Sequence, residues 1–213
     1  ALGERAVEGY HMVNIIIHLL TVIALFFFVR MTLLRPPLKD TFKDRAEWMA
    51  LVVAGVFALH PLQTETVSYI IQRAEALSSL FYVAALSCLI RFSDSEKGQA
   101  LGFWVLGILF FILGFGAKQT MITLPVVYVL YLLFFVERQG WKKGVLGILP
   151  LILAGIPFVI IAFVGSLGSA HAGFHMEELG QPEYFYTEMR ALVTYLGMIF
   201  VPVGQNVDHD YPV

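Results

Sequence analysis

Charged residues are scarce in this sequence, and cysteine is almost absent. Charged residues make up 14% of the 213 residues, whereas an ordinary globular domain has about a quarter. So few charges cannot coat the water-facing surface of a soluble domain of this size. Cys88 stands alone in an apolar run, which excludes a disulfide or a cysteine metal site within the chain. The net charge of −2 neither indicates nor excludes nucleic acid. Our expectation includes no nucleic-acid partner, no metal and no cofactor.

Apolar residues take the place of the missing charge. Hydrophobic residues make up 58% of the sequence and aromatic residues 14%, an excess typical of surfaces that face lipid or its interface. The sequence predicts an all-α integral membrane protein, because a helix of about 20 mainly apolar residues crosses the hydrocarbon core. We expect a polytopic helical bundle with about six spanning helices and an interfacial helix, forming a single transmembrane domain over residues 1–213. The predicted spans are 10–29, 48–59, 66–90, 101–117, 121–136 and 144–164, and the interfacial piece is 191–203.

Lysine and arginine are distributed unevenly between the two sets of connections. Ten of the 14 basic residues lie in the connections 30–45, 91–97 and 138–143. The opposite side has only Arg5, Arg73, Lys118 and Arg190. Because basic residues accumulate in cytoplasmic loops, the side with ten basic residues is predicted to face the cytoplasm. Residues 60–65, Lys118 and the loop 165–190 then face the periplasm or a lumen.

The third predicted span carries polar residues at spacings of three and four, which place side chains on one face of a helix. This stripe consists of Glu65, Ser68, Gln72, Glu75 and Ser79, with Arg73 beside it. Ionisable groups at membrane depth are costly, so each one is a hypothesis of function. One interpretation is a ligand-facing surface at the outer mouth of the bundle. The other is an internal ion pair between Arg73 and a carboxylate that locks helices together.

Two further polar features lie within apolar segments. The first predicted span has His11, Asn14 and His18 on one face. Such residues either bind metal and relay protons or hydrogen-bond to neighbouring helices. Lys118 stands at a break between two spans, where it either snorkels to the interface or presents its charge to an anionic group.

Charged groups of both signs collect at the predicted outer end of the bundle. They are His60, Glu65, Arg73, Lys118 and, in a polar loop that is either solvated or part of the site, Asp208 and Asp210. A mixed-charge mouth above a hydrophobic bundle suits a ligand with an anionic head and a lipid tail. A lipid-linked sugar phosphate is such a ligand.

Four segments of the sequence have distinctive residue patterns. They are YHMVNIIIH at 10–18, FALHPLQTE at 57–65 followed by Arg73-Ala74-Glu75, KQTMITLP at 118–125, and the segment 195–202 with NVDHD at 206–210. In this order, over nearly the whole chain, they resemble the transmembrane and tetratricopeptide-repeat O-mannosyltransferases and their bacterial relatives.

The resemblance implies a membrane glycosyltransferase of the GT-C type that works at the outer face of a membrane, here expected to be the bacterial inner membrane with the site toward the periplasm. Its donor is a sugar, typically mannose, on polyprenyl or dolichyl phosphate, and its acceptor is a protein hydroxyl. The catalytic base would be an acid in an outer loop before Ala1, so the catalytic residue of this chain is unknown. We expect the chain to be an internal piece, with a first span and that loop before Ala1 and further spans and tetratricopeptide repeats after Val213.

The resemblance also suggests roles for single residues. Arg73 and Lys118 would steady the lipid phosphate as it leaves, because fixed cations stabilise charge that develops in a dry site. His60, Glu65 and Glu75 would shape the pocket for the sugar or phosphate, and the outer-loop residues Asp208 and Asp210 would add contacts. The family usually has an acid after the lysine of the break, where this chain has Gln119. That departure favours the alternative: a catalytically silent GT-C-like structural subunit of a larger membrane complex.

The uneven distribution of basic residues generates a prediction about topology. Single cysteines at Lys43 and Lys142 are expected to resist an impermeant thiol reagent added from outside, because both positions lie on the predicted cytoplasmic side. A cysteine at His175 is expected to react. Labelling in the reverse pattern would overturn the orientation.

Overall fold

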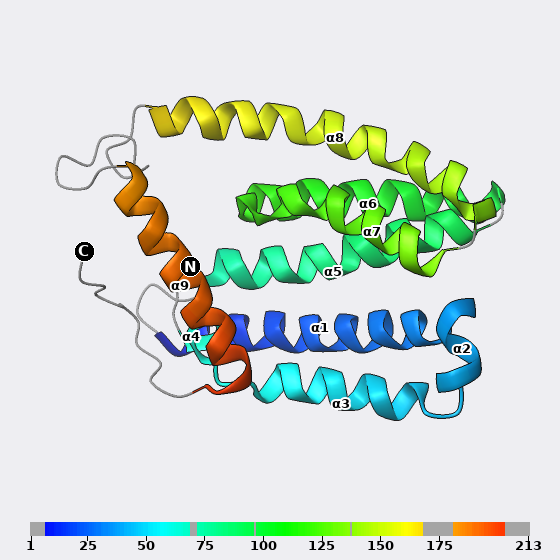
Figure 1. Cartoon of the computed structure of the whole chain (residues 1–213), viewed down its shortest axis with the longest axis horizontal. Coiled ribbons are helices and arrows are strands. Elements are labelled where there is room, and N and C mark those ends of the chain that lie inside the picture. The colour runs from blue at the N-terminus through cyan, green and yellow to red at the C-terminus, as the bar shows by residue number, and fades with distance from the viewer. Residues whose placement is uncertain (1–6, 69–71, 96, 137, 168–180, 203–213) are drawn as a thin grey trace. The chain divides into compact units, whose positions relative to one another are not determined.

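The computed structural model describes residues 7–68, 72–95, 97–136, 138–167 and 181–202 (Figure 1). Over these residues every regular element is a helix and no strand occurs, so the prediction of an all-α protein is confirmed. The chain divides into two compact units, Ala1–Ile156 (unit 1) and Pro157–Val213 (unit 2). The single transmembrane domain stays a prediction.

The helices follow the apolar segments of the sequence. In chain order they are α1 (Val7–Leu33), α2 (Pro36–Phe42), α3 (Ala46–Leu59), α4 (Gln63–Ser68), α5 (Arg73–Asp94), α6 (Lys97–Ala117), the 3₁₀ helix η2 (Gln119–Thr123), α7 (Leu124–Phe135), α8 (Arg138–Leu167) and α9 (Gln181–Phe200). Within the described residues, four helices are long and apolar enough to cross a membrane: α1, α5, α6 and α8. Two shorter apolar helices, Ala46–Leu59 and Gln119–Phe135, correspond to the other two predicted spans. By the length and composition of these helices, the chain is an integral membrane protein.

Prolines and extended residues determine where several helices end. Helix α3 ends at His60, whose ψ of 128° is extended, because a residue before proline is pushed out of the helical region. Helix α6 ends before Lys118, which has an extended backbone with φ −155° and ψ 146°. The break predicted at Lys118 is therefore confirmed.

The third predicted span differs from the structure. We expected one helix over 66–90, but α4 ends at Ser68 and a separate helix, α5, begins at Arg73. The prediction of one continuous polar stripe is therefore wrong, since its residues are divided between two helices. The physical reason lies in the composition of α4, Gln-Thr-Glu-Thr-Val-Ser. Its β-branched and hydroxyl side chains lower helix propensity and compete for backbone hydrogen bonds.

Unit 1 is built around α5. Helix α5 packs against α6 and α1, and α1 also packs against α3, so these helices lie side by side (Figure 1). The largest buried side chains of this core, all below 2% exposed, include Leu89, Ile90, Phe111, Tyr128 and Leu132. Close contact between helices depends on small residues. A Cβ atom at Gly114 would lie 2.8 Å from the Met121 Sδ atom and 3.0 Å from the Phe81 Cβ atom.

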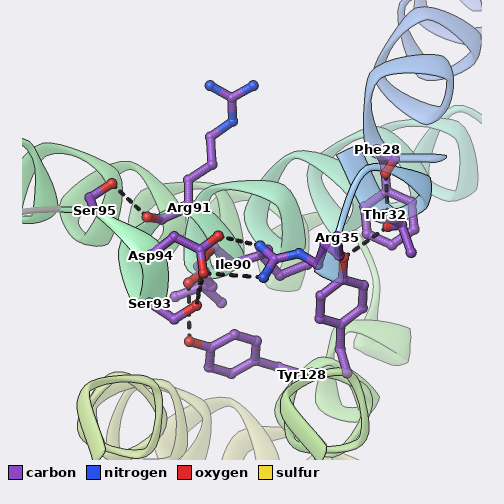
Figure 2. A network of polar contacts seen from close by, with 11 residues as sticks. Phe28, Thr32, Arg35, Ile90, Arg91, Ser93, Asp94, Ser95 and Tyr128 are labelled. Atoms are coloured by element: carbon purple, nitrogen blue, oxygen red, sulfur yellow. Dashed lines mark hydrogen bonds and ion pairs between the residues drawn. The ribbon is translucent and has the colours of Figure 1, made fainter. Parts of the chain in front are cut away.

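A polar network at one end of unit 1 connects α1, α2, α5 and α7, and we call it the Arg35 cluster (Figure 2). Arg35, 7% exposed, donates from Nη1 to the Asp94 Oδ1 atom at 3.1 Å and from Nη2 to the other carboxylate oxygen. Its guanidinium lies over the Tyr131 ring, 5.4 Å from the centroid, and the Tyr131 hydroxyl is 2.9 Å from the Thr32 Oγ1 atom. The ends of α1, α5 and α7 therefore meet at one side of unit 1, the side whose connections contain the basic residues.

Unit 2 contains α9 among its described residues. The sequence predicts a helical piece over 191–203, but α9 begins at Gln181 and ends at Phe200. The earlier start agrees with Pro182, because proline is well suited to the first turn of a helix. By length and composition α9 is not among the four helices that could cross a membrane. Its position in the interface stays a prediction.

The tight contact at Gly114 generates a prediction about stability. Gly114→Leu is expected to lower the stability of the detergent-solubilised protein by about 1–3 kcal/mol, because the added side chain overpacks the contact with Met121 and Phe81. Gly116→Leu is the matched control, since nothing lies within 4 Å of a Cβ atom at that position. Thermal denaturation measures both. Equal melting temperatures for the two variants would show that the close approach of α6 is not required.

Candidate functional site

Polar groups from α1, α4, α5 and η2 meet at the end of unit 1 opposite the Arg35 cluster. The Asn14 side chain in α1 donates to the Val67 carbonyl of α4 at 3.4 Å. Glu75 in the first turn of α5 forms an ion pair with Lys118 at the start of η2. We call this region the Arg73 end, after the residue that begins α5.

Arg73 is held by α1. Its Nε donates to the Asn14 Oδ1 atom at 3.4 Å, and its guanidinium lies over the Tyr10 ring, 5.1 Å from the centroid. Its Nη2 atom is buried and has no hydrogen-bond partner among the described residues. A guanidinium that is positioned on one side and retains a donor on the other is suited to bind an oxyanion.

The polar face of α1 forms contacts between helices. Asn14 is fully buried. The His18 ring stacks on Phe57 with centroids 5.6 Å apart, and its Nε2 lies 3.2 Å from the Ala58 carbonyl. Because a carbonyl only accepts, this nitrogen donates. The interpretation that this face hydrogen-bonds neighbouring helices is confirmed for Asn14 and His18. No group of three metal-ligating side chains occurs within the described residues.

Lys118 is paired with a carboxylate. Its backbone N–H donates to the Gly114 carbonyl at 2.9 Å and closes α6, while its side chain forms the ion pair with Glu75. The side chains of Lys118 and Glu75 are 44% and 31% exposed. The sequence left open whether Arg73 pairs with a carboxylate. Among the described residues, the cation that pairs with Glu75 is Lys118.

The other predicted site residues are placed less fully. The Nδ1 atom of His60 accepts the Leu62 backbone N–H at 3.2 Å, within the turn that follows α3. Glu65 belongs to α4, but its side chain is outside the described part of the structure. Asp208 and Asp210 also lie outside the described residues. The roles given to these four residues stay predictions.

A cavity of about 450 Å³ lies beside Glu75. It is lined by Thr21 and Leu25 of α1, Phe57 of α3, Gln63 and Thr66 of α4, Glu75, Ser78, Ser79, Tyr82 and Val83 of α5, and Thr120 and Thr123 of η2. Of the five residues predicted to bind phosphate or sugar, Glu75 alone is among these lining residues. Most of these hydroxyl groups were not predicted from the sequence. The spacing of four between Ser78 and Tyr82 places them on one face of a helix, but their partners in η2 lie about 40 residues away in the chain.

Four of the lining hydroxyls form pairs between α5 and η2, and we call them the hydroxyl ladder: Ser78, Tyr82, Thr120 and Thr123. The Ser78 Oγ and Thr120 Oγ1 atoms are 3.1 Å apart. The Tyr82 hydroxyl and Thr123 Oγ1 are also 3.1 Å apart, and Thr123 donates to the Thr120 carbonyl at 2.9 Å. The hydroxyl ladder joins the start of α5 to the break after α6.

The fold and this region together define an integral membrane protein with cationic groups and a polar cavity at one end of a helical bundle. Its sequence is similar to named relatives over part of its length. It is 34% identical to the human protein O-mannosyl-transferase TMTC1 over 144 residues, which are 63% of this chain and 15% of that protein. It is 35% identical to human TMTC4 over 46% of this chain and 14% of the relative.

A relative from Caenorhabditis elegans, protein O-mannosyl-transferase F38B6.6, is 36% identical over 40% of this chain and 11% of its own length. The chain is a distant homologue of the protein O-mannosyltransferases, and it spans between 11% and 15% of the length of these three curated relatives. No family model and no solved structure matches the chain.

The two ion pairs of α5 generate a prediction about stability. Asp94→Asn is expected to lower the free energy of unfolding by about 1–3 kcal/mol, because it removes the negative charge that pairs with the buried Arg35 guanidinium, although the Asp94 side chain itself is 45% exposed. Glu75→Gln is expected to cost only about 0.2–1 kcal/mol, because both side chains of its pair are partly exposed. Thermal denaturation of the purified protein compares them. A larger loss for Glu75→Gln would show that the Arg73 end, and not the Arg35 cluster, braces unit 1.

Proposed function

We propose that the chain is the donor-binding part of a GT-C-type membrane glycosyltransferase. In this reaction a mannose-like sugar moves from polyprenyl phosphate to a protein hydroxyl at the outer face of the membrane. The observation that carries the proposal is the buried Arg73 Nη2 atom, which has no partner among the described residues. The homology to protein O-mannosyltransferases supports sugar transfer as the reaction class.

Arg73 is suited to a phosphate because its contacts with the residues that the structure describes leave its charge unneutralised. Asn14 and the Tyr10 ring orient the guanidinium but bring no negative charge. Helix α5 begins at Arg73, and no side chain caps its first turn. The positive end of the helix dipole favours an anion at the same point.

Lys118 supplies a second cation. In the structure its charge is balanced by Glu75, and the pair is partly exposed, so it costs little to exchange Glu75 for another anion. When the glycosidic bond breaks, negative charge develops on the lipid phosphate. Fixed cations at that point stabilise the transition state more than the ground state.

The remaining parts of the proposal concern the whole protein. The catalytic base is an acid outside this chain, in an outer loop of a longer polypeptide that also has further spans and tetratricopeptide repeats. The distribution of basic residues favours an Arg73 end that faces the periplasm, across a bacterial inner membrane. The partners are then a lipid-linked sugar donor, a protein acceptor and membrane lipids.

One observation favours a second function, a catalytically silent structural subunit of a larger membrane complex. Gln119, exposed at the start of η2, stands where the resemblance leads us to expect an acid. Sugar transfer by the wild-type full-length protein separates the two functions. A protein that binds its membrane partners but transfers no sugar would be the silent subunit.

The proposed role of Arg73 is tested by comparing it with Arg35, whose side chain is buried. Arg73→Ala and Arg73→Lys are both expected to lower turnover by about 10²–10³. The planar N–H donors of the guanidinium stabilise the charge that develops on the lipid phosphate, and a lysine ammonium lacks this geometry. Yield and melting temperature of the full-length protein should stay near those of the wild type. Arg35→Ala is the matched control and should instead reduce yield and stability, because it removes the buried guanidinium that bonds to Asp94 and lies over the Tyr131 ring. Loss of stability in Arg73→Ala equal to that in Arg35→Ala would make Arg73 a structural brace and remove it from the site.

A further inference from the structure

The cavity beside Glu75 is lined by both polar and apolar side chains, and its polar residues include Thr21 of α1 and Gln63 and Thr66 of α4. Helices α5 and η2 contribute the hydroxyl ladder and the Glu75 carboxylate, whereas Leu25 of α1 and Phe57 of α3 contribute apolar surface. Its volume of about 450 Å³ lies within the range of small-molecule sites, about 300–1,000 Å³. A ligand that fills it has polar edges and an apolar face.

The hydrogen bonds of the hydroxyl ladder leave capacity for a ligand. Each hydroxyl has one proton and two lone pairs. In the pair Ser78–Thr120 one proton lies between the two oxygens, so the second hydroxyl has a proton to donate elsewhere. Because Thr123 donates to the Thr120 carbonyl, Tyr82 donates to Thr123 and its own oxygen is left as an acceptor. The cavity wall therefore offers donors and acceptors in alternation.

This pattern matches a neutral polyhydroxylated ligand better than the alternatives. A hydrocarbon tail would cover the hydroxyls without bonding to them, which costs free energy. A free anion would meet the Glu75 carboxylate in the wall. A sugar ring presents hydroxyls that both donate and accept, and it has C–H faces that can lie against Phe57 and Leu25.

The position of Tyr82 along α5 also favours a functional role for its hydroxyl. Tyr82 lies nine residues beyond Arg73, roughly 14 Å along α5. Polar side chains so far into an apolar bundle are costly and usually line a functional cavity. The cavity meets the cationic groups through Glu75, which both lines it and pairs with Lys118.

We infer that this cavity recognises the sugar of the lipid-linked donor, and that Tyr82, Thr120 and Thr123 determine the preference for a sugar-bearing lipid over a bare lipid phosphate. The inference rests on the proposed function, because the phosphate held by Arg73 and Lys118 places the attached sugar at the cavity. The two sites bind different parts of the donor. The cations bind its phosphate, and the hydroxyls bind its sugar.

The experiment measures the affinity of the full-length protein in lipid nanodiscs for two probes, polyprenyl phosphate and polyprenyl-phosphate mannose. The variants Tyr82→Phe, Thr120→Val and Thr123→Val each remove one hydroxyl at nearly constant shape. Thr41→Val, at an exposed position of α2, is the matched control. The wild type and the control should prefer the mannosyl lipid by at least about tenfold, which corresponds to one or two net hydrogen bonds. Each cavity variant should reduce this preference about five- to tenfold and leave the affinity for bare polyprenyl phosphate unchanged within about twofold.

Three outcomes contradict the inference. An equal affinity of the wild type for the two lipids, or a preference that all three cavity variants retain, overturns the inference and leaves the proposed function standing. A similar loss of affinity for both lipids in the variants assigns the hydroxyl ladder to structure alone. If the wild type binds neither lipid, the proposed function fails and the inference fails with it. Melting temperatures identify any variant that does not fold, and the other two variants then decide the result.

Discussion

Helix α5 is joined at each end by an ion pair to a segment distant in the sequence, and the arrangement of unit 1 depends on the pair in the Arg35 cluster. Glu75 in its first turn binds Lys118 at the break after α6, and Asp94 at its end binds Arg35 between α1 and α2. The hydrocarbon core has no water to satisfy a charge, so an ionisable side chain in a membrane bundle needs a partner from the protein. The pairs therefore determine which segments meet the two ends of α5.

The two pairs differ in the burial of the cation, since the Arg35 side chain is 8% exposed and the Lys118 side chain 44%. This separates stability from binding along roughly 29 Å of helix. In the Arg35 cluster a buried guanidinium makes two bonds to Asp94 and lies over an aromatic ring, so the cluster is suited to brace the fold. The pair of Glu75 with Lys118 is partly exposed and adjoins a cavity. Charges that exchange partners easily are suited to a ligand that arrives and leaves. The proposed site is thus the part of α5 where partly exposed polar groups can exchange a partner in the protein for a ligand.

The proposed function joins two observations that are weak alone. A helical membrane bundle supports many functions, so the fold by itself does not identify a reaction. The homology names a reaction class, but it covers only part of the chain and about 15% of each relative. The geometry adds what the homology lacks: an oriented guanidinium, a second cation and a hydroxyl-lined cavity at one end of unit 1. A lipid-linked sugar phosphate is the ligand whose parts correspond to each of these groups.

The sequence by itself determined the all-helical membrane class, three of the four long spans and the break at Lys118, because the length of an apolar segment is a local property of the sequence. It did not determine the partner of Glu75. Arg73 is the nearer cation in sequence, but residues two apart on a helix do not face each other. Only the tertiary structure brings Lys118 to Glu75 and turns Arg73 toward Asn14. It also forms the hydroxyl ladder, since each pair joins hydroxyls about 40 residues apart, and no local pattern specifies a contact between helices so distant in the chain.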